Sequence, residues 1–440
     1  MRNSDSQRSI TNTPSHMTRT ITLLSFLLAG TASLTAQWQA TTPPFATIDP
    51  SVGVNNFSMV TQDIIWSTPY GDLAYAAVST DGGDTWSANP LGNGTAGSQP
   101  SWIHGRSATE AWAVVGEAAR VLHTTNGGAN WTNAMPTAWT ELGAYPNHIH
   151  FFDAQNGIVL GDPVNGNWEI YKTSDGGSTW TPVTGLPAPL VQPAPNGIET
   201  STPKSTFVKG DNVWFGTKYG RVYRSGDRGL TWSVSETGMT IVHSLQFQDG
   251  MTGFANRFGV IKKTIDGGTT WNDHTDLGTM PSYWYSNVPS TNAWVSTGWG
   301  SIFGTAQSVD GGLTWSSIDA SRGRQISFWN NTTGYLAGSE GGALSFFRWV
   351  GSPFELSTSV NEMRDEIGVS FYPNPSADAI TITGVGSMTT AAIYTTTGQL
   401  VMQRLVGDNS TLTLNELVPG AYILELLEGD RVRRSHLVKQ

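Results

Sequence analysis

Short stretches in which apolar and polar side chains alternate recur along residues 38–352. One group covers 149–153, 157–161 and 169–172, and similar groups begin at 245 and 326. Alternation with a period of two puts successive side chains on opposite faces of a strand, and Gly, Asn and Asp between the stretches mark turns. The pattern therefore predicts an all-β chain built from short antiparallel strands.

An eight-residue segment with an Asp or Asn at its third position and a Trp at its last follows these groups six times. We call these copies the box segments. Their acidic or amide positions lie 39 to 52 residues apart, a spacing typical of one four-stranded propeller blade. The residues that define them are Asp81 and Trp86, Asn126 and Trp131, Asp175 and Trp180, Asp227 and Trp232, Asp266 and Trp271, and Asp310 and Trp315.

The residue types in a box segment are those of a tight hairpin. A carboxylate can accept hydrogen bonds from backbone amides a few residues on, and Gly supplies a positive φ. We expect the indole to fold beneath the hairpin and become buried. These Asp residues are therefore predicted to be structural rather than catalytic.

A seventh unit begins at residue 326 but lacks a box segment. Residues 38–43 copy the spacing from Trp to Pro that follows a box segment at residues 131–136. We predict that the N-terminal segment supplies the last strand of the final blade, with Trp38 close to Phe346, since this would close the ring. Residues 37–352 would then form a seven-bladed β-propeller.

The end of the chain has a different character. A polar stretch at 353–369 predicts a linker, and residues 370–440 contain short alternating strands separated by Gly, Pro and Asn. This pattern is typical of a small immunoglobulin-like β-sandwich.

The N-terminus predicts a signal peptide over residues 1–36. Arg19 precedes an apolar run that is too short for a permanent membrane span, and small residues follow it. Met1 and Met17 both precede this run, and either is a candidate start of translation. No later segment is apolar enough to predict a transmembrane span.

Composition agrees with a β-rich exported protein. Only 13% of residues are charged, Gly and Trp are plentiful, and there is no Cys. The formal net charge of −10 disfavours nucleic-acid partners, because phosphate binding needs clustered Lys and Arg.

Two family resemblances follow from these motifs. The box segments resemble those of Asp-box propellers, which include sialidases, xyloglucanase-type glycosidases, sortilin-like receptors and photosystem II assembly factor-like proteins. The Tyr-Pro-Asn-Pro start at 372–375, the Pro-Gly-x-Tyr strand at 419–422 and the Leu-Val-Lys at 437–439 resemble the C-terminal sorting domain of the type IX secretion system of Bacteroidota. Two residues depart from the family pattern: Thr395 follows a Tyr where the family often has Asp, and Gln440 follows the Lys at which the family usually ends. The second resemblance implies export across the outer membrane, with residues 370–440 as the contact for the secretion machinery.

Propeller ligands usually bind where the central channel opens. We expect the binding face to be the one opposite the box segments, formed by the loops between second and third strands and those that enter each blade. Ligand-binding candidates there are Tyr70, Arg106, Trp139, Tyr219, Arg257, Trp284, Trp299 and Arg324.

Catalytic chemistry has little support in the sequence. A glycosidase needs two opposed carboxylates, and the acids available on this face are Asp162, Glu117 and Glu340. His148 and His150 alone do not make a metal site, so we expect no metal and no cofactor. The favoured hypothesis is a non-catalytic module that binds an extracellular glycan, peptide or envelope protein. The alternative is a sialidase-like or xyloglucanase-like glycoside hydrolase.

Overall fold

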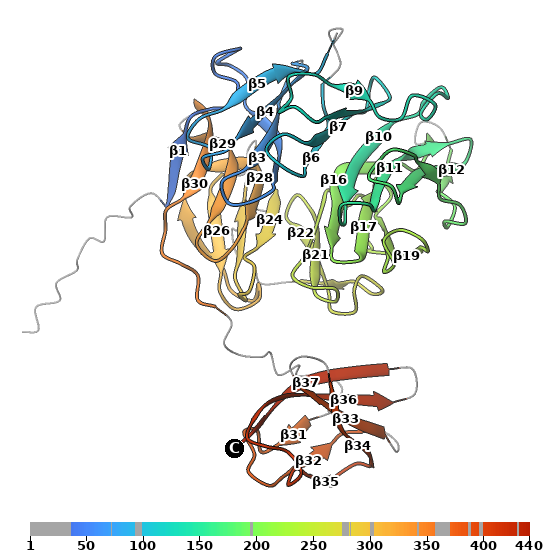
Figure 1. The fold of residues 1–440 in the computed structure, drawn as a ribbon, viewed down its shortest axis with the longest axis vertical. Coiled ribbons are helices and arrows are strands. Elements are labelled where there is room, and N and C mark those ends of the chain that lie inside the picture. The colour runs from blue at the N-terminus through green and yellow to red at the C-terminus, as the bar shows by residue number, and fades with distance from the viewer. Residues whose placement is uncertain are drawn as a thin grey trace, which may run out of the picture. The chain divides into compact units, whose positions relative to one another are not determined.

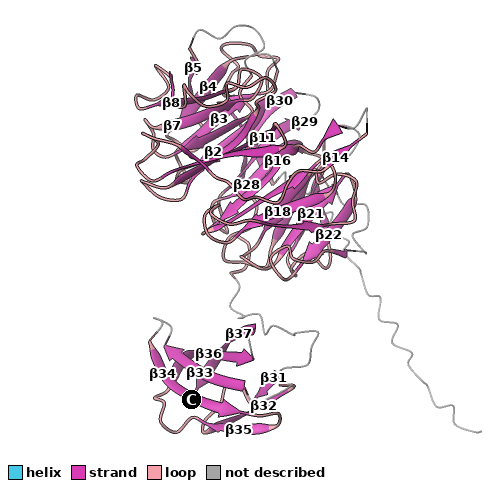
Figure 2. Cartoon of the chain, turned by 90° about the vertical axis from the view of Figure 1, so that its right-hand side faces the viewer, coloured by secondary structure: helices cyan, strands magenta, loops and turns pink. Residues whose placement is uncertain are grey.

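A computed structural model describes residues 37–440 of the chain apart from several short gaps (Figure 1). The gaps are residues 72, 93–98, 194–196, 275–280, 282, 300–302, 341–342, 357–369, 386–388, 396–398 and 429–430. The predicted signal peptide and most of the predicted linker lie outside the described residues. Strands and loops make up all that is described, as Figure 2 shows. In this part of the chain, no helix is long and apolar enough to cross a membrane.

The N-terminal body consists of four-stranded antiparallel sheets, each made of strands that are mostly consecutive in the chain. Six of them, in chain order, are β2–β5 (Val54–Met59, Ile65–Pro69, Tyr75–Ser79, Ser87–Pro90), β6–β9 (Trp102–Gly105, Ala111–Val115, Arg120–Thr124, Thr132–Asn133), β10–β13 (Pro146–Phe151, Gly157–Val164, Asn167–Thr173, Thr181–Pro182), β16–β19 (Ser201–Lys209, Asn212–Thr217, Arg221–Ser225, Ser233–Glu236), β20–β23 (Ser244–Phe247, Gly253–Arg257, Val260–Thr264, Asn272–Asp273) and β24–β27 (Trp284–Asn287, Trp294–Thr297, Thr305–Ser308, Ser316–Asp319). The last sheet combines β28–β30 (Arg322–Phe328, Gly334–Glu340, Ala343–Trp349) with β1 (Trp38–Thr41).

The first strand of each sheet contacts the first strand of the next. This series runs through β2, β6, β10, β16, β20, β24 and β28, and β28 also contacts β2. The sheets are therefore arranged as the blades of a propeller. Hydrogen bonds join neighbouring blades. The Trp66 indole donates to the Ser107 carbonyl at 2.8 Å, and the Trp214 indole donates to the Gly267 carbonyl at 2.7 Å.

The predicted closure by the N-terminal segment is confirmed. β1 pairs antiparallel with β30, with Trp38 opposite Trp349 and Thr41 opposite Phe346. Trp38 is 2% exposed. Figure 1 shows the two strands, from opposite ends of the body, side by side. The same sheet also packs Phe354, which is 5% exposed although the sequence placed it in the linker.

The box segments have the predicted hydrogen bonds. In the segment at 79–86, Asp81 accepts the Thr85 amide at 2.9 Å and the Thr85 hydroxyl at 2.6 Å, and the Gly83 amide donates to the Ser79 hydroxyl. Gly82 and Gly83 have φ of 70° and 89°, which L side chains rarely adopt. In the equivalent turn, hydrogen bonds from Thr179 lower the pKa of Asp175 to about 2.

Burial of the box indoles is less complete than expected. Trp271 is buried, whereas the other five indoles are only half-buried. In four of these five the ring nitrogen donates back to a Gly carbonyl of its own turn, for example Trp86 to Gly83 at 3.1 Å. This bond ties the indole to its own turn, and the side chain stays partly exposed.

An inserted hairpin that the sequence did not predict lies between the third and fourth sheets. It comprises β14 (Val191–Gln192) and β15 (Gly197–Ile198). Glu199, which follows it, is completely buried and forms an ion pair with Arg221. This pair fastens the insertion to the blade that follows.

The C-terminal body contains two sheets that share one core. One sheet is β31–β32–β35 (Ser370–Tyr372, Ala379–Thr383, Ser410–Thr413) and the other is β34–β33–β36–β37 (Leu400–Val406, Thr389–Thr395, Gly420–Glu428, Arg431–Lys439). Ile380 and Leu412 from the first pack with Ile393 and Leu424 from the second. Two packed sheets are the arrangement expected of a β-sandwich.

Candidate functional site

Three predicted ligand-binding residues come together beside the start of the inner strand β28. The guanidinium carbon of Arg324 lies 3.3 Å from the ring centroid of Tyr70 and 4.4 Å from that of Trp299. The two rings belong to loops of the first and sixth sheets, so ring closure brings them to Arg324. Stacking on aromatic faces holds a guanidinium in place while its edge stays available for hydrogen bonds.

A second cation, which the sequence analysis missed, lies next to Arg324. Lys204 extends from β16, and its Nζ donates to the carbonyl oxygens of Asn55 at 3.3 Å and Arg324 at 3.4 Å. Its ammonium therefore reaches from the fourth sheet to the first and last. Burial, and secondarily the charge of Arg324, lower the pKa of Lys204 to about 7.

Aromatic rings continue the surface from Lys204. Its Nζ lies 5.9 Å from the ring of Tyr283 and 5.8 Å from that of Trp284. The ring of His243 packs against those of Tyr283 and Phe258, with ring centroids 4.7 Å and 4.5 Å apart. Burial lowers the pKa of His243 to about 4, so this imidazole is neutral at physiological pH. We call the surface formed by Lys204, Arg324, Tyr70, Trp299 and Tyr283 the channel mouth.

An open cavity of about 310 Å³ is lined by the inner strands of the four-stranded sheets of the N-terminal body. Among the described residues, no Lys, Arg, Asp or Glu lines it. Its walls include Trp102, Trp284 and Trp329 with other apolar side chains, the three histidines His104, His148 and His150, and neutral amides and hydroxyls. Burial lowers the pKa of all three histidines, to about 4 for His150. The channel interior is therefore uncharged, and Trp284 is common to its wall and the surroundings of Lys204.

The candidate acid Asp162 is hydrogen-bonded within the contact between two blades. Asp162 Oδ1 accepts hydrogen bonds from the Asn147 side chain and from the Ser201 amide, both at 2.9 Å, and so joins the third sheet to the fourth. Glu117 is exposed in the turn between β7 and β8, and Glu340 is the last residue of β29. No pair of opposed carboxylates is seen at the mouth in the described residues.

The remaining ligand candidates are spread over the propeller. Arg106 follows β6, at the opposite end of the inner strand from the mouth, and pairs with Glu110 at 3.7 Å; its placement on the binding face was wrong. Trp139 is 4% exposed and packs within the core. The Tyr219 hydroxyl donates to the Gly197 carbonyl at 2.7 Å and so holds the inserted hairpin. Arg257 is exposed at the end of β21.

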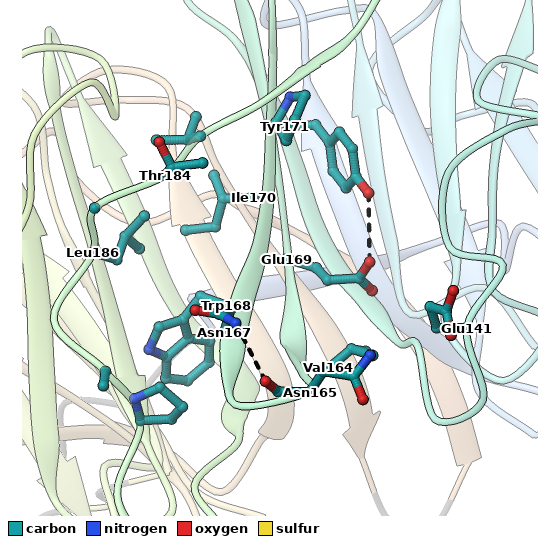
Figure 3. Close-up of a pocket in the computed structure, with 15 residues that line it drawn as sticks. Glu141, Val164, Asn165, Asn167, Trp168, Glu169, Ile170, Tyr171, Thr184 and Leu186 are labelled. Carbon is teal, nitrogen blue, oxygen red and sulfur yellow. Dashed lines mark hydrogen bonds between the residues drawn. The ribbon is translucent and has the colours of Figure 1, made fainter.

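A second cavity, of about 360 Å³, lies beside β12 (Figure 3). Glu141, Glu169, Trp168 and Tyr171 are among its lining residues. The sequence does not indicate this cavity, because part of its wall comes from the unpredicted segment that leads to β14. Among the described residues, no group of three or more His, Asp or Glu side chains is placed to hold a metal ion.

Comparisons with known proteins agree with both bodies. Residues 370–440 match the family model for the secretion system C-terminal sorting domain. This segment is a type IX sorting domain. Such a domain interacts with the type IX machinery, so the chain is directed to secretion or to the cell surface. No curated protein matches the chain in sequence.

Solved structures show the fold of the N-terminal body. YCF48 bound to a D1 peptide is similar with a TM-score of 0.55 and 19% identity, over 72% of this chain and 97% of that one. YCF48 from Cyanidioschyzon merolae is similar with a TM-score of 0.52 and 16% identity, over 71% of this chain and 98% of that one. PorZ, a surface component of the type IX system of Porphyromonas gingivalis, has a TM-score of 0.44 and 13% identity, over 88% of this chain and 59% of that one. The two YCF48 structures identify a β-propeller.

Asp162 gives a pH-dependent prediction. Burial raises its pKa to about 6, so the folded protein holds this proton more tightly than the unfolded chain does. The stability it contributes is complete below about pH 4 and is lost as the pH rises through 6. We therefore expect Asp162→Asn to gain about 2–3 kcal/mol relative to wild type between pH 4 and pH 7.

Urea unfolding at several pH values measures this difference. Asp49→Asn is the control, because Asp49 is partly exposed and hydrogen bonds from Ser51 lower its pKa. A constant difference between Asp162→Asn and wild type across this pH range would contradict the assignment.

Proposed function

We propose that residues 37–352 form a seven-bladed Asp-box propeller that binds an acidic group of an extracellular ligand at the channel mouth. In this proposal the signal peptide ends at residue 36, and residues 370–440 direct export. The ligand is a glycan or peptide that carries a carboxylate, and the uncharged cavity receives the part next to that carboxylate. The module is non-catalytic.

One observation carries this proposal. Lys204 and Arg324 lie side by side at the mouth, and neither forms an ion pair with a carboxylate among the described residues. Two adjacent cations repel each other, which is why Arg324 contributes to lowering the pKa of Lys204. An anion between them would relieve that repulsion and accept charge-assisted hydrogen bonds. A propeller of similar fold, YCF48, has been solved with a bound peptide.

A hydrolase finds less support. The general acid and the nucleophile or base of a glycosidase must lie on either side of the bond that is cleaved. Asp162 is instead hydrogen-bonded into the contact between two blades, and the mouth carries cations.

The test uses the mature chain and two probe sets that differ only in charge. One contains uronate-terminated and neutral oligosaccharides, and the other contains peptides with a free or an amidated C-terminus. We expect the acidic members of one set to bind, and Arg324→Gln or Lys204→Gln to weaken that binding by at least about tenfold. Arg106→Gln, which removes a cation at the opposite end of the inner strand from the mouth, is the matched control and should change affinity less than about twofold.

The pH dependence adds a second readout. Lys204 is charged below about pH 7 and becomes neutral above it, so affinity for the acidic probe should fall as the pH rises through this region. Lys204→Gln should abolish that fall. Equal binding of acidic and neutral probes, or binding that neither mouth substitution affects, would overturn the proposal.

A further inference from the structure

The strand β12 has an outer edge that is only partly paired. Its neighbour β13 has two residues and pairs with Tyr171 and Lys172 alone. One more hydrogen bond follows, from the Val183 amide to the Ile170 carbonyl at 2.8 Å. Within the described residues, no strand pairs with this edge at 167–169. An open edge offers backbone donors and acceptors to an incoming strand.

The second cavity lies against this open edge. Segment 182–189 forms one wall and β12 the other, as Figure 3 shows with Leu186 and Ile170 on facing elements. Trp168 and Tyr171 supply aromatic surface. The ring of Trp139 packs against that of Tyr171, with the ring centroids 5.0 Å apart. The volume of about 360 Å³ is within the range of about 300–1,000 Å³ typical of ligand pockets.

Two carboxylates line the cavity, and no described Lys, Arg or His does. Glu169 Oε1 accepts the Tyr171 hydroxyl at 3.4 Å, and Glu169 Oε2 is shielded from solvent with no hydrogen-bond partner. In Figure 3 the carboxylate of Glu169 points toward Glu141. Burial and then the charge of Glu141 raise the pKa of Glu169. A buried carboxylate oxygen without a partner is costly, and a cationic donor would satisfy it.

We propose that this cavity binds an extended basic segment of a partner protein, which adds as a strand beside β12 and places an Arg or Lys side chain between Glu141 and Glu169. The open edge offers backbone pairing, and the carboxylates select a positive charge. The ring of Tyr171, on the same face of β12 as Glu169, offers a surface on which a guanidinium can stack. The site is separate from the channel mouth and opposite to it in charge. It therefore stands whether or not the mouth binds an acid.

The experiment measures binding of blocked pentapeptides Thr-Val-X-Val-Thr to the mature chain by calorimetry, with X as Arg, Lys, Gln or Glu. We expect the Arg and Lys peptides to bind at least about tenfold more tightly than the Gln peptide. The Glu peptide should bind least. Glu169→Gln should weaken the Arg peptide at least about tenfold. N-methylation of the peptide amides that face β12 should weaken it similarly.

Two variants control for indirect effects. Glu117→Gln removes an exposed carboxylate elsewhere, and Arg324→Gln alters the mouth; both should leave the affinity for the Arg peptide unchanged. Circular dichroism verifies that Glu169→Gln is folded. Equal affinity for the Arg and Gln peptides, or full affinity of folded Glu169→Gln, would refute the cation site. Full affinity of the N-methylated peptide would refute strand addition.

Discussion

Replacement of Glu199 by glutamine is expected to lower the free energy of unfolding by about 3–5 kcal/mol. Glu199 is completely enclosed, and its carboxylate accepts hydrogen bonds from Arg221, from the Thr217 hydroxyl at 2.5 Å and from the Leu190 amide at 2.9 Å. Glutamine keeps the shape but puts an NH₂ group where only acceptors fit, and it leaves the guanidinium without its countercharge.

Equilibrium unfolding in urea gives the magnitude. Glu117→Gln makes the same chemical change at an exposed position and should shift stability by no more than about 0.5 kcal/mol. Replacing both partners by apolar residues, as in Glu199→Leu with Arg221→Met, should cost less than the single change, because no buried charge is then left unpaired. A loss below about 1 kcal/mol for Glu199→Gln would show that the inserted hairpin is not fastened by this pair.

The repeated architecture could be predicted because its signal is local. Each box segment closes on itself within eight residues, so the turn is visible in the sequence before any tertiary contact is known. The partnership of Trp38 with the last sheet was also predictable, because residues 38–43 copy a strand that appears beside the other box segments. Repetition supplied the long-range information that a single strand lacks.

The channel mouth was only partly predictable, since it depends on strand register. Tyr70, Trp299 and Arg324 were assigned to one face, and the structure brings them together. Lys204 was missed because the pairing of β16 with β17 is irregular between Ser201 and Thr206, and alternation does not indicate its direction there. Arg106 was misplaced because β6 ends at residue 105, which puts the next residue at the other end of the channel.

The second cavity had no signal in the sequence. Its carboxylates lie in segments separated by almost thirty residues, Glu141 in a loop between sheets and Glu169 within β12. The wall opposite β12 is the segment that follows β13, which has no counterpart in the other repeats. Where the repeat is broken, nothing in its pattern indicates which residues meet.

Ring closure is expected to depend strongly on one indole. Trp38 packs edge-on against Trp349, with ring centroids 5.1 Å apart, and against Phe328 at 6.0 Å. Removing a buried aromatic ring typically costs about 3–5 kcal/mol, so Trp38→Ala should destabilise the propeller by about that amount. Backbone pairing of β1 with β30 does not replace the lost packing, because those hydrogen bonds are exchanged for bonds to water when the strand detaches.

The neighbouring residue provides the control for that prediction. Gln39 is exposed on the same strand and pairs with Arg348, so Gln39→Ala keeps the backbone register and should change stability by less than about 0.5 kcal/mol. Detachment of β1 uncovers the edge of β30, so Trp38→Ala should also speed proteolytic cleavage near residues 37–45 under native conditions. If Trp38→Ala unfolds at the same urea concentration as Gln39→Ala, closure does not rest on the indole, and the antiparallel pairing of four residues is sufficient by itself.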